Sequence, residues 1–201
     1  MKIGIDFSIK STAMAIQKAN GEMILYSFVS NYKTGLRKFK VHEHFSNVII
    51  TEGYEKLSGS NDEQSEKLRN ADTLSNLILL KLQEYNEIPD EIRIEGYSYG
   101  SKGNAFIDLI TFNTFLKVKL IQKYSHIIKV IPPKTLKKQF TGNGNATKCD
   151  MIRSFMNEKN PQFGTLQQML TQMDFIKEDK DFQIPKPIDD VIDAIALTCI
   201  G

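Results

Sequence analysis

Residues 187–197 read Pro-Ile-Asp-Asp-Val-Ile-Asp-Ala-Ile-Ala-Leu, three carboxylates in a stretch whose other members belong in a buried helix. At about 3.6 residues per turn, Asp190 and Asp193 project from one face of that helix. Burying two like charges side by side costs on the order of several kcal/mol unless a cation or a proton neutralises them. The stretch therefore predicts a divalent metal site. Asp189, just after Pro187, is interpreted as the N-cap.

The composition is that of an ordinary globular protein. The chain has 201 residues, of which 41% are hydrophobic and 25% charged, so a single domain over residues 1–201 can bury a core. No run approaches the roughly 18 apolar residues of a membrane span, and the N-terminus does not resemble a signal peptide. We expect a cytoplasmic protein with no membrane partner. Cys149 and Cys199 lack metal-ligand spacing and are expected to be reduced thiols.

The hydrophobic pattern predicts a mixed sheet that opens with an antiparallel meander. Strands are expected at residues 2–7, 12–17, 23–29, 91–97 and 127–131, with Asn20-Gly21 as a hairpin turn. Helices are expected at about 62–85, 105–124, 147–157 and 188–199, with a helical turn at 134–140. Residues 48–51 are compatible with a further short strand that is not counted. This order predicts an α/β fold, a mixed five-stranded sheet flanked by helices.

Two segments lengthen this plan. Residues 31–60 begin with several basic residues and are interpreted as a basic insertion. Residues 159–187 are polar and contain Pro161, Pro185 and Pro187, so we expect a linker with at most one short helix.

Two further acids lie inside predicted strands, Asp6 in the first and Glu95 in the fourth. If these strands are neighbours, both side chains can point to one spot at the end of the sheet, where the last helix would add Asp190 and Asp193. Four carboxylates are the hard ligands that two Mg²⁺ or Mn²⁺ ions take in a phosphodiester-cleaving site. Each strand acid also has a structural alternative: Asp6 could cap a turn, and Glu95 could pair with Arg93 or a lysine.

A basic segment follows the fifth predicted strand. From Lys129 to Arg153 there are six basic residues and one acid, Asp150. Gly142 and Gly144 permit close approach of the backbone, and the N-terminus of the following helix favours phosphate. The segment lacks the Gly-Lys-Ser/Thr ending of a Walker loop. A solvated loop is the alternative, but lysines beside an acidic cluster are what hold a nucleic-acid backbone.

A glycine-rich turn after Glu95 carries Tyr97, Tyr99 and Lys102. The tyrosines could stack on an exposed base, although packing at the rim of the sheet is the commoner role, and Lys102 is expected to contact phosphate. The candidate DNA contacts are Lys102, Lys134, Lys137, Lys138, Asn143, Asn145 and Lys148.

In this order, four segments resemble the RuvC-like Holliday junction resolvases of the RNase H-like superfamily, especially those of bacteriophages. They are Ile3-Gly4-Ile5-Asp6, Ile94-Glu95-Gly96-Tyr97, residues 137–148, and Asp190-Val191-Ile192-Asp193-Ala194. The resemblance implies an RNase H-like fold, a homodimer and Mg²⁺-dependent paired nicking of four-way DNA junctions. The longer segments 31–60 and 159–187 depart from the compact bacterial form and could alter the dimer interface or the substrate range.

The resemblance also implies roles for individual residues. Asp6, Glu95, Asp190 and Asp193 match the metal-binding acids, with Asp6 bridging the two ions, and Lys138 and Lys148 match basic positions near the junction. Lys148 would hold or neutralise the scissile phosphate. The alternatives are a broader branched-DNA nuclease, an RNase H acting on RNA–DNA hybrids, a non-catalytic junction-binding protein, and an actin-like or sugar-kinase-like nucleotide-binding protein. The last needs a second lobe that 201 residues hardly hold.

Overall fold

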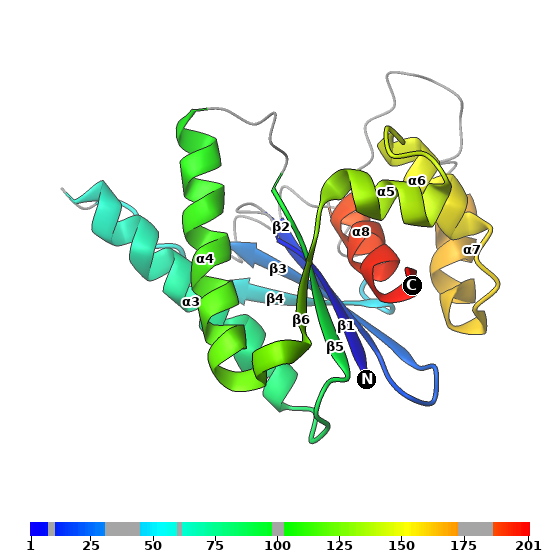
Figure 1. Cartoon of the computed structure of the whole chain (residues 1–201), viewed down its shortest axis with the longest axis horizontal. Helices are drawn as coiled ribbons and strands as arrows, with labels where there is room; N and C mark the ends of the chain where they lie inside the picture. Colours follow the sequence, from blue (N-terminus) through cyan, green and yellow to red (C-terminus); the bar gives the residue numbers. More distant parts are fainter. Residues whose placement is uncertain (8–10, 31–44, 60–61, 98–102, 173–186) are drawn as a thin grey trace.

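The computed structural model describes residues 1–7, 11–30, 45–59, 62–97, 103–172 and 187–201. At its centre is a six-stranded sheet in the order β4-β3-β2-β1-β5-β6 (Figure 1). Its strands are β1 (Lys2–Asp6), β2 (Ser11–Gln17), β3 (Met23–Ser30), β4 (Ile49–Tyr54), β5 (Glu91–Glu95) and β6 (Ile128–Ile131). The first three strands form the predicted antiparallel meander, and the other three pairings are parallel.

The sheet has one strand more than the five predicted. β4 is an edge strand that pairs with β3 from Ile49, opposite Leu25, to Tyr54, opposite Ser30. Its middle residues include Glu52 and Gly53, which are poor strand formers, so the local pattern is weak. An edge strand needs no continuous apolar run because one side of it is not covered by another strand.

Helices cover both faces of the sheet, as the predicted fold class requires (Figure 1). One face carries α3 (Glu63–Gln83) and α4 (Asn104–Tyr124). The other carries α5 (Pro133–Thr141), α6 (Lys148–Met156), α7 (Gly164–Gln172) and α8 (Ile188–Cys199). Two short 3₁₀ turns, Ser125–Ile127 and Pro161–Phe163, precede β6 and α7. Within the described ranges, no helix is both long enough and apolar enough to cross a membrane.

Strand alternation divides the interior into two apolar clusters. Ile3 and Ile5 of β1 belong to the cluster under α3 and α4. Ala13 and Ala15 of β2 belong to the cluster under α8. Small residues on the second face allow α8 to lie close to the sheet.

The closest approach is at Gly4 of β1. A Cβ atom built there would lie 2.1 Å from the carbonyl oxygen of Ala194 and 2.8 Å from Cβ of Leu197. Only glycine lets the backbones of β1 and α8 come this near each other. The absence of a side chain at Gly4 therefore allows α8 to lie this close to β1.

The two segments that lengthen the plan are described in part. Residues 31–44 lie outside the described residues, and β4 occupies part of the remainder of segment 31–60. Residues 173–186 also lie outside them. Within 159–172, α7 buries Leu166 and Leu170, and the ring of Phe163 packs against Phe155 of α6 with centroids 5.1 Å apart. This part of the predicted polar segment therefore contributes to the core beneath α8.

Candidate active site

Asp6 and Glu95 lie next to each other because β1 and β5 are parallel neighbours. The register pairs Ile5 with Ile94. Asp6 and Glu95 are the next residues, so they end β1 and β5 side by side. Gly4 faces α8, and alternation puts Asp6 on that same face. The side chains of Asp6 and Glu95 lie within hydrogen-bonding reach of each other, and this contact raises the pKa of Asp6 and opposes the rise in the pKa of Glu95. The sheet thus brings these two acids together, as predicted.

The last helix brings Asp190 and Asp193 to the same spot. The pKa of Asp6 is raised well above its usual range, first by burial and then by the charges of Glu95, Asp190 and Asp193. Burial and the charges of Glu95, Asp190 and Asp189 raise the pKa of Asp193 to about 8, against an opposing effect of Lys148. These effects require short separations. Asp6, Glu95, Asp190 and Asp193 therefore form one cluster, called here the carboxylate cluster.

Two lysines border the carboxylate cluster. Burial raises the pKa of Glu95, and the nearby Asp190 adds to this, while the contact with Asp6 and the charges of Lys137 and Lys148 act in the opposite direction. Lys137 is half-buried on α5, and Lys148 is exposed at the start of α6. The site thus combines buried negative charge with accessible positive charge at its rim.

Arg93 holds the other end of α8. It is 5% exposed, and its Nη1 donates hydrogen bonds to the carbonyl oxygens of Leu197, at 3.0 Å, and of Ile200. Its Nη2 donates to Glu91 Oε2 at 2.6 Å. Arg93 therefore pairs with Glu91, and the alternative in which it pairs with Glu95 is wrong. The guanidinium group of Arg93 thus gives hydrogen-bond donors to carbonyl groups that the end of a helix leaves without partners.

Asp189 is not the N-cap that its position suggested. The helix begins two residues earlier than that reading requires, at Ile188 with Pro187 as the N-cap, so Asp189 lies within the first turn. Its side chain is 3% exposed and forms an ion pair with Lys148, whose side chain is 58% exposed. An acid in the first turn still benefits from the helix dipole. The sequence contains one signal that Asp189 lies near the site: it stands four residues before Asp193 and so shares its side of the helix.

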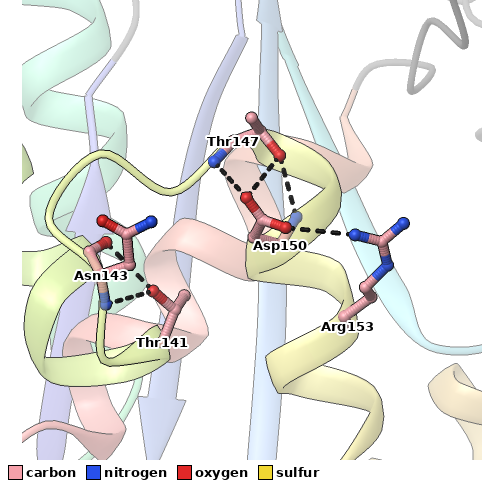
Figure 2. A network of polar contacts seen from close by, with 5 residues as sticks. All are labelled: Thr141, Asn143, Thr147, Asp150 and Arg153. Carbon is pink, nitrogen blue, oxygen red and sulfur yellow. Dashed lines mark hydrogen bonds and ion pairs between the residues drawn. The ribbon is translucent and has the colours of Figure 1, made fainter. Parts of the chain in front are cut away.

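A capping box fixes the start of α6, where Lys148 is the first residue (Figure 2). The backbone N–H of Thr147 donates to Asp150 Oδ2 at 2.8 Å, and the N–H of Asp150 donates to Thr147 Oγ1 at 3.2 Å. Arg153 Nη1 donates to Asp150 Oδ1 at 3.2 Å. The Thr-x-x-Asp spacing is the usual signature of such a cap. The backbone of Lys148 is therefore well anchored.

The loop before α6 folds back on α5. Gly142 has a φ of 83°, the left-handed conformation that ends many helices at glycine. Asn143 donates from its backbone N–H to Thr141 Oγ1 at 3.1 Å (Figure 2), and its Oδ1 accepts from the N–H of Asn145 at 3.0 Å. The Asn143 side chain, predicted to contact DNA, thus has a structural role in this turn. The side chain of Asn145 is exposed.

The remaining predicted contacts have mixed positions. Lys134 and Lys138 are exposed on α5, whereas Lys102 and Tyr99 lie outside the described residues. Tyr97 packs edge-on against Phe106, with ring centroids 6.2 Å apart, and Lys117 Nζ lies 4.4 Å from the centroid of the Tyr97 ring. Tyr97 therefore packs at the rim of the sheet, the commoner of its two expected roles.

The carboxylate cluster suits a hard divalent cation in its chemistry. All four side chains offer carboxylate oxygens, the ligands that Mg²⁺ and Mn²⁺ prefer, and a cation would offset the repulsion that raises the pKa of Asp6. In the part of the chain that the structure describes, no three Asp, Glu, His or Cys side chains are arranged to hold an ion as they stand. Asp6 and Glu95 instead lie within hydrogen-bonding reach of each other.

Comparison with known proteins supports the fold. No protein-family model and no curated protein matches this chain. Among solved structures, Thermus thermophilus RuvC is similar, with a TM-score of 0.50 and 13% identity over 98% of this chain and 91% of that one. T. thermophilus RuvC in complex with a Holliday junction substrate has a TM-score of 0.48 and 12% identity, over 98% and 89%. At this identity the first likeness concerns the architecture alone: the chain has a RuvC-like, RNase H-like fold.

Proposed function

We propose that this protein is a metal-dependent endonuclease that hydrolyses phosphodiester bonds in branched DNA, with the four-way Holliday junction as its main substrate. The proposal rests on the carboxylate cluster, in which four acids from β1, β5 and α8 interact at one end of an RNase H-like sheet. The resemblance to phage resolvases suggests that the protein cuts recombination and repair intermediates in the cytoplasm of an infected cell.

Each acid has a distinct place in the proposed reaction. When two Mg²⁺ or Mn²⁺ ions are bound, they supply an activated water and neutralise the leaving oxygen. Asp6 would be a ligand shared by both ions, as the resemblance implies, and Glu95, Asp190 and Asp193 would be the remaining ligands. The charges of these three acids all act on the pKa of Asp6. The burial of Asp6 and Asp190 excludes bulk water from their side of the reacting phosphate.

Lys148 acts on the phosphate directly in this proposal. Its ammonium group is accessible, and it lies close enough to the carboxylate cluster to act on the pKa of both Glu95 and Asp193. A phosphate held at the cluster would come within its reach, and a charged donor there stabilises the extra negative charge of the transition state. Replacing Lys148 by Ala is therefore expected to lower kcat by about 100-fold.

The surface of α5 and the following loop extends this contact along the DNA backbone. The proposed phosphate contacts besides Lys148 are Lys102, Lys134, Lys137, Lys138, Asn143 and Asn145. The Oδ1 of Asn143 accepts from the N–H of Asn145, and its exposed amide NH2 group is the part that would donate to a phosphate. Lysine contacts of this kind give an affinity that falls steeply with salt concentration and does not depend on base sequence. Selectivity for junctions would then come from DNA shape.

A homodimer is proposed because α4 presents an exposed stripe with heptad spacing. The stripe repeats every three or four residues along the helix; its exposed members are Ile107, Thr114, Val118 and Ile121, and Thr111 between them is half-buried. Such spacing suits packing against a second helix of the same kind. Two copies joined there would carry two sites for symmetric strands. Val118→Glu should convert the dimer to a monomer in sedimentation; a monomeric wild type would contradict this interface.

The test of the function is a cleavage assay with Mg²⁺ on four substrates: a four-way junction, a Y-fork, a linear duplex and an RNA–DNA hybrid. We expect paired, symmetric nicks in the junction, which disappear in Asp190→Asn. Glu87→Gln, which removes an exposed acid beyond the end of α3, is the control and should cut normally. Preference for the hybrid would identify an RNase H, and preference for the fork a broader nuclease. Tight junction binding without any cleavage would identify a binding protein.

A further inference from the structure

The ion pair between Asp189 and Lys148 joins the two helices that border the site. Its partners differ greatly in exposure: the Asp189 side chain is 3% exposed, and that of Lys148 is 58% exposed. An ordinary surface ion pair would have two accessible partners. Here a buried carboxylate anchors an accessible ammonium group, so the pair has one fixed end and one end that a substrate can reach.

The backbones at both ends of the pair are held in place. The capping box of Thr147 and Asp150 fixes the first turn of α6, and Met151, Ile152 and Phe155 of that helix are buried in the core beneath α8. At the other end, Asp189 lies in the first turn of α8, which Gly4 and Arg93 hold against the sheet. The flexible part is therefore the lysine side chain itself, and Asp189 restrains it.

Asp189 and Asp190 have different tasks because they leave α8 in different directions. One residue along a helix is a rotation of about 100°. Asp190 raises the pKa of Asp6 and Glu95, whereas the ion pair of Asp189 is with Lys148 of α6. Asp189 also adds to the raised pKa of Asp193, so it lies between the carboxylate cluster and its basic rim.

An ammonium group has three N–H donors, and its stem has four rotatable bonds. One contact to Asp189 leaves donors for a phosphate oxygen. We propose that Asp189 is a positioning residue, which holds Lys148 Nζ beside the carboxylate cluster so that its remaining donors meet the scissile phosphate. This inference rests on the proposed function. It assigns Asp189 no contact with the phosphate.

The decisive comparison is between Asp189→Asn and Asp150→Asn. Both remove one negative charge from the same pair of helices, but Asp150 contacts Thr147 and Arg153 and not Lys148. For junction cleavage we expect Asp189→Asn to lower kcat about tenfold with KM unchanged, since an orienting partner typically has effects of this size. Asp150→Asn should keep kcat within about twofold, because the Asn amide oxygen can still accept the hydrogen bond from the Thr147 N–H.

A double mutant tests whether Asp189 acts through Lys148. In a Lys148→Ala background, Asp189→Asn should lower kcat by less than about twofold, because two residues that act as one unit are not additive. A further tenfold loss in that background would overturn the inference. So would a tenfold increase in the Mg²⁺ concentration needed for half-maximal cleavage, which would make Asp189 a metal-binding group instead.

A readout without substrate separates this inference from the nuclease proposal. Proton–nitrogen NMR of lysine ammonium groups should show a persistent Lys148 signal in the wild type and in Asp150→Asn, and its loss in Asp189→Asn. No cleavage of any substrate with this pattern intact would refute the nuclease and leave the restraint standing. Unchanged kcat in Asp189→Asn, with the signal lost and the wild type active, would refute positioning alone.

Discussion

The two faces of the central sheet use the same strands for different purposes. On β1, Ile3 and Ile5 point into the apolar cluster beneath α3 and α4, where they are fully buried. Gly4 and Asp6 point the other way, toward α8. On β1, one side thus carries large side chains buried in an apolar cluster, and the other side carries a glycine and an acid.

The difference shows how buried acids are tolerated in this protein. Asp6, Asp189 and Asp190 are all buried on the α8 face, where charge is costly without a partner. The two apolar clusters, one on each face of the sheet, together offset that cost. Substitutions on the two faces should therefore separate activity from stability.

The largest effect is expected on the α8 face, from Asp6→Asn. Removing the proposed bridging carboxylate should lower cleavage by at least about 1,000-fold, while junction binding and folding stay close to wild type. Single-turnover cleavage and a gel-shift assay measure the two properties separately. If cleavage and binding are lost together with the fold, Asp6 is structural and the site assignment is wrong.

Gly4→Ala should give the next largest effect, on both activity and stability. The new methyl group would collide with the Ala194 carbonyl and push α8 off β1, which is expected to destabilise the protein by about 3 kcal/mol and reduce cleavage about tenfold or more. Gly164→Ala is the control, because a Cβ there meets nothing within 4 Å. Urea unfolding and cleavage rates check both variants. Equal behaviour of the two would mean that α8 can shift without consequence.

Ile5→Ala tests the opposite face. The cavity should lower the free energy of unfolding by about 2–4 kcal/mol. The kcat of the folded protein should stay within about twofold, since Ile5 points away from the carboxylate cluster. Measuring cleavage at a temperature well below the unfolding midpoint distinguishes the two quantities. A large fall in kcat under those conditions would show that the two faces are not separable.

A further expected effect is a pH dependence of stability in metal-free buffer. The pKa of Asp6, Glu95 and Asp193 is raised in the folded protein, so the folded state holds protons that the unfolded chain releases. The free energy of unfolding should therefore decrease as pH rises from about 5 towards 8, by at most about 1.4 kcal/mol per pH unit for each proton. Mg²⁺ should oppose this decrease.

Asp193→Asn provides the reference for that slope, because it removes the group whose pKa is about 8. Its unfolding free energy should depend less on pH than that of the wild type, whereas Glu87→Gln beyond the end of α3 should not change the slope. Urea titrations in a chelator at several pH values measure this. A wild-type stability that rises over the same interval would contradict the buried acidic cluster.

Much of the secondary structure could be predicted because its signals are local. The meander, α3, α4, α6 and α8 all follow from hydrophobic period, turns and caps. β4 is not among the five predicted strands, because Glu52 and Gly53 weaken its pattern and its place depends on pairing with a strand distant in sequence. Such non-local pairing leaves little trace in a single sequence.

The candidate site divides in the same way. The grouping of Asp6 with Glu95 could be predicted, because both end a strand and parallel neighbours bring their ends together. The partner of Asp189 could not, since it depends on how close α6 lies to α8. Arg93 likewise looked like a partner for Glu95, and only the packing of α8 shows that it binds the end of that helix.

The dependence of the site on α8 has a consequence for folding. Asp6 and Asp190 stand near opposite ends of the printed sequence, so they meet only after the sheet has formed and α8 has docked. Contacts between such distant residues are made late and are slow to form. If α8 detaches in a local opening, the carboxylate cluster disperses while the α3–α4 cluster can persist. The proposed cutting activity would then be confined to fully folded molecules, which protects DNA from incomplete ones.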